Sequence, residues 1–382
     1  MSNADVLVIA GEHSGDTIAA ELVRELSKRS ECLGWRFFGA GGAAMRSAGV
    51  DVLHDLTSIS VIGPMDAAMR YFTFRNVFNR LLQEAAERRP SLVILIDFSH
   101  FNHKFAHAIR QLQPSIPGWN PRITKVVSPQ VWASRPGRAR TMEQDLDLLL
   151  CIFPFEPGWY ATHAPKLRTC FVGHPLMDRY QRRSSDATPE HGHEGNRCVL
   201  LPGSREQEIR RHLPVMAEVA RHVSSQIACE WVLVVPDQRL MPLARRLAGG
   251  GIRLQVGSLS EALRCASMAI ASTGSVTLEC AYFETPTLAM YKTSWLTYWI
   301  ARRIITVKYL AMPNILADEE IMPEFIQGDA SVEKISSHAL KLMQDPARRS
   351  RMRAQLRAVV DGLGQGGAAI RSADAILGML KA

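Results

Sequence analysis

Several residues that could bind or transform a ligand stand directly after short apolar runs of the sequence. Asp97 follows one such run, at residues 92–96. In a parallel sheet, a side chain at the carboxyl end of a strand points into the crevice where α/β proteins bind ligands. A partly desolvated carboxylate there could act as a general base, and it could equally cap the helix that follows.

Two loops in the second half of the sequence have the residue types of an anion site. Gly203-Ser204-Arg205 follows the run 198–201, and Arg205 could chelate phosphate oxygens. The small residues 272–275 precede a predicted helix whose N-terminal N–H groups could cradle a phosphate, and Glu279 could accept hydrogen bonds from a ribose diol. Each loop alone could be an ordinary capped turn. Together they predict a nucleotide diphosphate site that needs no metal ion.

The first apolar run, at residues 6–10, leads into the loop Gly11-Glu12-His13-Ser14-Gly15-Asp16. Glycines at such a turn let a ligand approach the backbone, and a helix predicted over residues 16–30 would offer its N-terminus. The alternative is a tight turn in which Ser14 or Asp16 caps that helix.

Patterns for a cofactor or a metal are weak. Residues 39–44 match the G-x-G-x-x-A pattern of dinucleotide sites, but they follow the second predicted strand and precede a short helix. His100, His103 and His107 could share a helix face, but no nearby carboxylate or cysteine completes a zinc site. A Walker A pattern is absent from the sequence. We therefore predict neither a cofactor nor a metal ion.

The elements that must position these residues alternate between short apolar runs and helical patterns. The predicted strands are residues 6–10, 36–38, 92–96, 123–127, 148–153, 170–172, 198–201, 231–235, 252–256, 268–271 and 287–290. A polar segment at 182–196 separates two series of strands and helices. This order predicts an α/β fold with two facing, doubly wound, Rossmann-like domains and a central cleft. The predicted domains are residues 1–181 and 182–382, with the last helix a candidate to pack back on the first domain.

Composition limits the class of protein and its partners. Hydrophobic residues make up 47% and charged residues 21%, which is typical of a soluble globular protein. The formal net charge of +8 predicts an anionic partner: a phosphorylated small molecule, an acidic membrane surface or nucleic acid. Nucleic acid is not expected, because the basic residues are scattered and no RNA-binding motif occurs. The seven Cys residues form no C-x-x-C pair, which favours free thiols in a reducing cytoplasm. No apolar run is long enough to span a membrane.

A series of ordered motifs resembles one family over nearly the whole chain. The motifs are Gly11 to Asp16, Ile96-Asp97 with Phe101-Asn102, Ser128-Pro129-Gln130-Val131-Trp132-Ala133, Phe153-Pro154-Phe155-Glu156, Phe171-Val172-Gly173-His174-Pro175, Leu201-Pro202-Gly203-Ser204-Arg205, Ser272-Thr273-Gly274 to Glu279, and Met312-Pro313-Asn314-Ile315-Leu316. In this order they resemble the bacterial lipid-A-disaccharide synthases, which are glycosyltransferases with the GT-B arrangement.

The resemblance implies an inverting transfer of 2,3-diacylglucosamine from UDP-2,3-diacylglucosamine to 2,3-diacylglucosamine 1-phosphate. The implied products are UDP and the β-1,6-linked lipid A disaccharide 1-phosphate of lipopolysaccharide biosynthesis, and no metal ion is implied. Asp97 matches the proposed general base. The implied acceptor-loop residues are Glu12, Ser14, Asp16, His100 and Asn102. The implied UDP-binding residues are Arg205, Ser272, Thr273, Gly274, Ser275, Thr277, Glu279 and Asn314. Such an enzyme is expected in the cytoplasm, peripherally on the inner face of the inner membrane, with a homodimer as a candidate state.

Three departures from the family pattern concern the acceptor side. Ser99-His100 stand where the family commonly has Pro-Asp, Asp66 where it has Glu, and Ser134 where it has a second Trp. We therefore expect a changed acceptor pocket, in which His100 could orient the acceptor or relay a proton.

Acylated substrates require contact with a bilayer, and two segments could provide it. The first is amphipathic, basic and aromatic, and its predicted membrane or acyl contacts are Met65, Met69, Phe72, Phe74 and Phe78. Composition alone favours an ordinary core-facing helix there, and the resemblance favours the membrane. The second segment, residues 295–310, could meet a membrane or another helix. Two further functions remain open: another GT-B UDP-sugar enzyme (a glycosyltransferase or an epimerase) with a changed acceptor, and a non-catalytic nucleotide-sugar or nucleic-acid binder.

Overall fold

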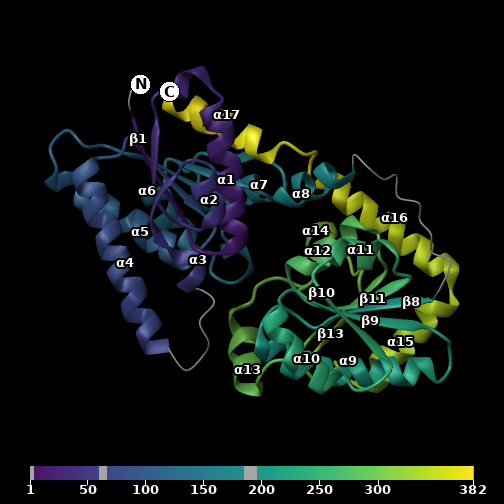
Figure 1. Cartoon of the computed structure of the whole chain (residues 1–382). Coiled ribbons are helices and arrows are strands. Elements are labelled where there is room, and N and C mark those ends of the chain that lie inside the picture. The colour runs from purple at the N-terminus through teal and green to yellow at the C-terminus, as the bar shows by residue number, and fades with distance from the viewer. Residues whose placement is uncertain (1–3, 60–66, 185–195, 382) are drawn as a thin grey trace. The chain divides into compact units, whose positions relative to one another are not determined.

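The computed structural model describes residues 4–59, 67–184 and 196–381 (Figure 1). The chain forms two compact units. The first comprises Met1–Gln181 and Leu363–Ala382, and the second comprises Arg182–Gly362. The division after Gln181 falls where the sequence placed it, and the last helix belongs to the first unit. None of the described helices is both long and apolar enough to cross a membrane.

The first unit is built on a parallel, seven-stranded sheet with the order β3-β2-β1-β4-β5-β6-β7. Its strands are β1 (Asp5–Ala10), β2 (Arg36–Gly41), β3 (Asp51–Asp55), β4 (Leu92–Ile96), β5 (Arg122–Val126), β6 (Leu148–Cys151) and β7 (Thr169–Phe171). Its helices are α1 (His13–Ser27), α2 (Ala43–Ser47), α3 (Leu56–Ile59), α4 (Ala67–Arg88), α5 (Ser99–Leu112), α6 (Arg138–Asp145), α7 (Glu156–His163), α8 (Pro175–Ser184) and α17 (Ala368–Leu380).

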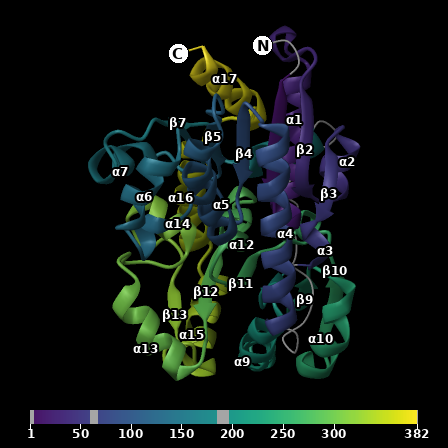
Figure 2. The same cartoon turned by 90° about the vertical axis from the view of Figure 1, so that its left-hand side faces the viewer.

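Apolar side chains on both faces of this sheet explain why its strands are continuous apolar runs. Leu7 and Ile9 of β1 pack in a core with α4, α5, α6 and α7. Val6 and Val8, which point to the other face, pack with α1, α2 and α17 (Figures 1 and 2). The C-terminal helix thus completes the layer that α1 begins.

The second unit has a parallel, six-stranded sheet with the order β10-β9-β8-β11-β12-β13. Its strands are β8 (Arg197–Leu201), β9 (Glu230–Val235), β10 (Ile252–Val256), β11 (Met268–Ser272), β12 (Thr287–Tyr291) and β13 (Glu324–Ile326). Its helices are α9 (Glu206–Ser224), α10 (Met241–Ala248), α11 (Leu259–Arg264), α12 (Ser275–Tyr282), α13 (Trp295–Ile304), α14 (Met312–Ala317), α15 (Val332–Gln344) and α16 (Pro346–Gly362). Helix α9 packs against α10 and α15, and α12 packs against α14 and α16.

In each sheet the strand order reverses once, and this reversal determines where a ligand can bind. The first sheet reverses between β1 and β4, and the second between β8 and β11. Loops leave in opposite directions at such a point, which opens a crevice at the carboxyl ends of the two strands. The loops that follow these four strands are the ones that the sequence singled out.

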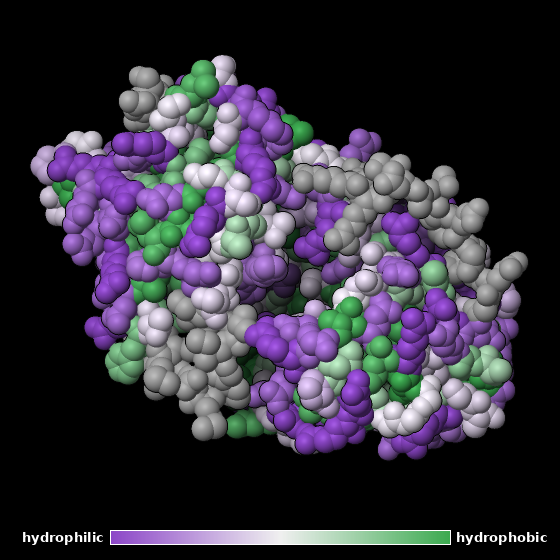
Figure 3. All heavy atoms as spheres, in the orientation of Figure 1, coloured by the Kyte–Doolittle hydropathy of each residue, from purple (hydrophilic) through white to green (hydrophobic). Residues whose placement is uncertain are grey.

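The prediction of two parallel α/β domains is confirmed, and every predicted strand coincides with an observed strand. β3 and β13 were not predicted. β3 is an edge strand with a half-buried interior, in which only Val52 and Leu53 are apolar, and β13 has three residues. Neither is a continuous apolar run. On the side of the molecule shown in Figure 3, the surface is largely hydrophilic, with apolar side chains scattered among polar ones.

Candidate active site

Asp97 occupies a strained backbone position at the carboxyl end of β4. Its φ is 44°, and that of Phe98 is 41°, so two consecutive non-glycine residues adopt the left-handed conformation. Such residues persist only where the surroundings hold them, and they cluster at functional sites. Here the Asp97 N–H donates to the Val126 carbonyl at 3.0 Å. The turn presents a half-buried Asp97 side chain at the point where the strand order reverses.

Two buried side chains hold the Asp97 peptide in this turn. The Asn102 amide donates to the carbonyl oxygens of Ile96 and Asp97, at 3.0 Å each. The Lys125 ammonium donates to the Asp97 carbonyl at 2.7 Å. Asn102, predicted to lie in the acceptor loop, is fully buried, so it positions the turn instead of facing a ligand.

Lys125 is a functional candidate that sequence reasoning missed. It lies on β5 with 2% of its surface exposed. Burial lowers the pKa of Lys125 to about 8, against the opposing effect of the Asp97 charge. A charged residue in the otherwise uncharged predicted strand 123–127 was the available signal. The titratable Lys125 ammonium therefore contacts the backbone carbonyl of the candidate base.

The burial of Lys125 predicts a pH-dependent stability. In the folded chain its pKa is about 8, below the ordinary 10.5. Between these values the unfolded chain keeps a proton that the folded chain has released, so the contribution of Lys125 to the unfolding free energy is lowest below pH 8 and rises towards pH 10.5. Relative to Lys125→Met, the wild type should therefore gain on the order of 3 kcal/mol across this window.

Urea unfolding of both proteins across this pH range measures that difference. Lys104→Met, an exposed change on α5, is the control and should run parallel to the wild type. A stability difference between wild type and Lys125→Met that stays constant with pH would show that the lysine does not titrate in this window.

The Gly11-to-Asp16 loop lies directly against the Asp97 turn. A Cβ atom at Gly11 would stand 2.2 Å from the Phe98 ring, so only glycine fits there. A Cβ atom at Gly15 would stand 3.6 Å from the Asp97 Cβ. Glu12 and Ser14 are exposed on this loop. The structure therefore brings these two predicted acceptor residues to the edge that holds Asp97.

Asp16 has a different role from the ones predicted. Its carboxylate is fully buried and accepts the backbone N–H groups of Gly42, Ala44 and Met45 at 2.8–3.1 Å. It therefore caps α2, and the expectation that Asp16 or Ser14 caps the first helix is wrong, because α1 begins at His13 with Glu12 as its N-cap. Two of these bonds use the Gly42 and Ala44 N–H groups of the G-x-G-x-x-A pattern, which are therefore not available to a dinucleotide phosphate.

Removing the Asp16 carboxylate should destabilise the first unit. Asp16→Ala leaves three N–H groups without their acceptor, and we expect the unfolding free energy to fall by about 3 kcal/mol. Asp16→Asn keeps one acceptor oxygen and should lose less. Chemical denaturation measures both variants, with the exposed Ser14→Ala as the matched control on the same helix. Equal stability of Asp16→Ala and Ser14→Ala would contradict the capping role.

His100 is exposed in the first turn of α5, close to the Asp97 turn. Burial and the nearby charges of Lys104, Arg138 and Arg135 lower its pKa, which favours a neutral imidazole. His107, on the same helix, lies 3.2 Å from Asp145 instead of forming a cluster with His100. Among the described residues, no group of three His, Cys, Asp or Glu side chains could hold a metal ion.

Glu156 organises the next two loops of the same sheet edge. Its carboxylate accepts hydrogen bonds from the Ser128 hydroxyl, from Trp132 Nε1 at 3.0 Å and from the N–H groups of Ile152 and Phe153. Burial raises the pKa of Glu156, although these bonds oppose that effect. Glu156 thus ties the loops after β5 and β6 together. The family motifs had included it without giving it a role.

The predicted membrane segment lies partly within the described residues. Met65 and the side chain of Met69 lie outside them. Phe72, on α4, is 60% exposed. Phe74 and Phe78 are half-buried and pack against α5: Phe74 lies 5.7 Å from Phe98, and Phe78 lies 5.4 Å from Phe101, between ring centroids. One side of each of these two rings therefore faces the core, as the core-facing alternative predicts. With Phe98 and Phe101 they form an aromatic wall next to the Asp97 turn.

In the second unit, Arg205 ends the loop after β8 and is the N-cap of α9. Glu208 accepts the N–H groups of Ser204 and Arg205 at 2.9 and 3.2 Å, which orders the loop around Gly203. The guanidinium lies 3.3 Å from Glu208 but is 76% exposed. A surface ion pair of this kind is weak, so Arg205 is available to an anionic ligand.

The Ser272–Ser275 loop lies beside the Arg205 loop. Leu201 and Ala271 are partners in the sheet, so the two loops leave neighbouring positions. Gly274 has a φ of 126°, which only glycine adopts without strain, and no side chain caps the helix α12 that follows. With Ser275 exposed at its first turn, this N-terminus has the positive dipole end of an anion site. Thr273 and Glu279 are half-buried beside it.

Asn314 and Thr277 are buried and hold the loops in place. Asn314 donates to the Met322 carbonyl at 2.7 Å and to Glu324 at 2.9 Å, and its oxygen accepts the N–H groups of Ile321 and Met322. These four bonds use the full capacity of the amide. Thr277 donates to the Gly274 carbonyl and accepts from the Met312 N–H, which joins α12 to α14. Both side chains therefore bond within the protein and position these loops.

His212 was missed by sequence reasoning and joins the Arg205 loop to the loop after β12. Its Nδ1 lies 2.7 Å from the Pro202 carbonyl, and the Lys292 N–H donates to its Nε2 at 3.0 Å. This pattern assigns the Nδ1–H tautomer of a neutral ring, and burial lowers the pKa of His212 accordingly. Its position inside α9 gave no signal in the sequence.

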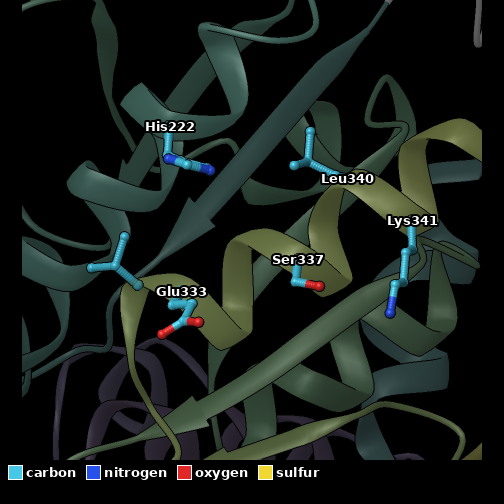
Figure 4. Close-up of a pocket in the computed structure, with 6 residues that line it drawn as sticks. His222, Glu333, Ser337, Leu340 and Lys341 are labelled. Carbon is cyan, nitrogen blue, oxygen red and sulfur yellow. The ribbon is translucent and has the colours of Figure 1, made fainter.

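A hollow of about 560 Å³ lies elsewhere in the second unit, between α9 and α15. It is lined by His222, Val332, Glu333, Ser337, Leu340 and Lys341. Its polar side chains do not converge on one point (Figure 4). The hollow contains none of the predicted site residues and supports no function.

Known proteins are similar to this chain over nearly its whole length. A family model described as Lipid-A-disaccharide synthetase matches residues 6–373. The chain is 36% identical to the lipid-A-disaccharide synthase of Syntrophus aciditrophicus (strain SB), over 100% of this chain and 99% of that protein. This chain belongs to the lipid-A-disaccharide synthetase family. It is therefore an enzyme of a glycosyltransferase family of lipid A biosynthesis, as the resemblance implied.

Solved structures with low sequence identity agree with the GT-B fold expected of the lipid-A-disaccharide synthetase family. A putative UDP-N-acetylglucosamine 2-epimerase from Listeria monocytogenes matches with a TM-score of 0.66 and 15% identity, over 100% of this chain and 96% of that one. The calicheamicin glycosyltransferase CalG4 matches with a TM-score of 0.59 and 14% identity, over 100% and 99%. The predicted fold class is confirmed.

Proposed function

We propose that this chain condenses UDP-2,3-diacylglucosamine with 2,3-diacylglucosamine 1-phosphate, which gives the β-1,6-linked lipid A disaccharide 1-phosphate and UDP. Membership of the lipid-A-disaccharide synthetase family supports this reaction. The observation that carries the assignment of the site is the left-handed turn of Asp97, held by Lys125 and Asn102 where the strand order reverses.

In the proposed reaction, the Asp97 carboxylate accepts the proton of the acceptor's 6-hydroxyl as that oxygen attacks the anomeric carbon. The bond from this carbon to the β-phosphate oxygen breaks, and its electron pair leaves with UDP. Attack opposite to the leaving group inverts the anomeric centre. The clamped Asp97 peptide supports this role, because a general base acts only when it is held within hydrogen-bond reach of its proton. In this proposal His100, exposed in the first turn of α5, orients the acceptor.

In the proposed reaction, groups of the second unit stabilise the negative charge of the leaving diphosphate. The exposed Arg205 and the uncapped N-terminus of α12 supply positive charge at adjacent loops. Preorganised groups of this kind stabilise charge that develops in a transition state. On this basis we propose a site for UDP that uses no metal ion and no cofactor.

Acylated substrates require contacts for their acyl chains and for a membrane surface. The aromatic wall of Phe74, Phe78, Phe98 and Phe101 supports an acyl-chain contact next to Asp97. We propose that the enzyme works in the cytoplasm, peripherally associated with the inner face of the inner membrane, and that a homodimer is its candidate assembly.

UDP release tests the proposed function. With both lipid substrates present, UDP should be released, and omission of either substrate should abolish the release. A sugar 2-epimerase would instead convert UDP-N-acetylglucosamine with no acceptor present. If a folded preparation epimerises UDP-N-acetylglucosamine and transfers no sugar, the proposed function is wrong and the chain is a UDP-sugar epimerase.

A further inference from the structure

Helix α13 of the second unit exposes large apolar side chains. None of its residues is buried. The exposed fractions at this helix and the residue after it are 61% for Trp295, 73% for Leu296, 55% for Trp299, 52% for Ile300, 40% for Ile304 and 37% for Ile305. Figures 1 and 2 show α13 at the periphery of the second unit, outside the sheet. An exposed apolar patch of this kind marks an interaction surface.

The apolar side of α13 faces outward, which is the reverse of an ordinary surface helix. At about 100° per residue, the larger apolar side chains fall within one half of the helix circumference; they are Trp295, Leu296, Trp299, Ile300 and Ile304. Tyr298 and Ala301 fall on the opposite side, and both are half-buried. Packing against the second unit therefore leaves the apolar half uncovered.

Positive charge accompanies the apolar face. Arg302 and Arg303 lie exposed in the last turn of α13. Across the part of the chain that the structure describes, no ion pair neutralises either of them. No acidic residue occurs between Glu284 and Asp318. The surface formed by Trp295–Ile305 with this arginine pair is thus apolar, aromatic and cationic.

We propose that α13 is an interfacial helix that inserts its apolar face into the surface of an anionic lipid bilayer. Tryptophan is enriched at the headgroup level, and arginine pairs with anionic headgroups while its stem stays in the apolar region. This inference rests on the proposed function, whose substrates lie in a bilayer. It names a contact in the second unit, apart from the predicted segment 65–78 of the first. A second copy of the chain suits the surface less, because the arginine pairs of two such faces would repel each other.

Flotation of the full chain with lipid vesicles tests the proposal. The probes are vesicles of phosphatidylglycerol and of phosphatidylcholine. Trp295→Ser/Trp299→Ser removes the two rings, and its control is Leu33→Ser, which changes a side chain that is 71% exposed in the first unit. Arg302→Gln/Arg303→Gln removes the charges, and its control is Arg245→Gln/Arg246→Gln, an exposed pair in the last turn of α10. Thermal unfolding shows that each variant is folded.

The wild type should float with phosphatidylglycerol vesicles and far less with phosphatidylcholine vesicles. We expect the tryptophan variant to lose about tenfold or more in vesicle binding, the arginine variant to lose its preference for phosphatidylglycerol, and both controls to bind as the wild type does. Undiminished binding of the folded tryptophan variant would overturn the proposal. So would a lipid-free dimer of the wild type that this variant dissociates.

UDP release from short-chain, water-soluble substrates separates this inference from the proposed function. Vesicle binding that depends on Trp295 and Trp299, without UDP release, would leave the interfacial helix standing and reject the reaction. UDP release together with vesicle binding that does not depend on Trp295 and Trp299 would reject the interfacial role of α13 and leave the proposed reaction standing.

Discussion

Asp97→Asn should lower kcat about a thousandfold while the enzyme still binds UDP. Asparagine keeps the size of the side chain and leaves the clamps from Lys125 and Asn102 to the backbone in place. It cannot accept the proton of the acceptor hydroxyl, so the loss should appear in kcat and hardly in KM. Initial rates of UDP release, at saturating concentrations of both substrates, measure the effect.

Asp55→Asn is the matched control for this variant. Asp55 is an exposed carboxylate at the end of β3 in the same sheet, and its hydrogen bonds to described residues are local, from Thr57 and Ser58. Its variant should retain wild-type turnover. Near-wild-type turnover of a folded Asp97→Asn enzyme would contradict the assignment of Asp97 as the base.

Arg205→Gln should lower kcat/KM about a hundredfold, because it removes one of the positive groups assigned to the diphosphate. The affinity for UDP should fall as well, since the same charge acts on the bound product. Isothermal titration with UDP and the rate of UDP release measure the two effects. Arg205→Lys should recover only part of the loss, because an ammonium lacks the bidentate geometry of a guanidinium.

Arg210→Gln is the control for Arg205. It lies on the same helix, α9, and forms a surface ion pair with Glu206. Its removal should leave both UDP affinity and rate unchanged. An unaltered UDP affinity in Arg205→Gln would show that the diphosphate lies elsewhere.

The fold could be predicted where the chain is apolar on both faces of a sheet. β4 has the predicted bounds, because its five buried apolar residues are bordered by polar turns. β10 also has the predicted bounds, although it is an edge strand that alternates apolar and polar residues. β3 could not be predicted in the same way, since its half-exposed edge position needs no continuous apolar run. The place of α17 beside α1 depends on packing between residues far apart in the sequence.

The site could be predicted as far as residue type and position at a strand end determine it. Asp97, Arg205 and Gly274 lie at the strand ends where the sequence placed them. Whether a polar residue faces a ligand or the protein depends on three-dimensional partners. Asp16 and Asn314 have the right type and position, but their hydrogen bonds are used within the protein. No local pattern could distinguish these cases.

The roles of Lys125 and α13 could not be predicted from the sequence, because they depend on which residues surround them in the fold. Lys125 stands in an apolar strand, and only the neighbouring Asp97 turn explains a buried cation there. The segment 295–310 could be read as a membrane contact or as a helix–helix contact. The exposure of Trp295 and Trp299 favours the first within the described structure.

Mass spectrometry of the lipid product tests the central proposal most directly. The wild type is incubated with UDP-2,3-diacylglucosamine and 2,3-diacylglucosamine 1-phosphate, and Asp97→Asn is treated in the same way. The wild type should yield a disaccharide 1-phosphate whose mass is that of the two substrates minus UDP, and Asp97→Asn should yield almost none. A folded, UDP-binding wild type that forms no disaccharide would contradict the account.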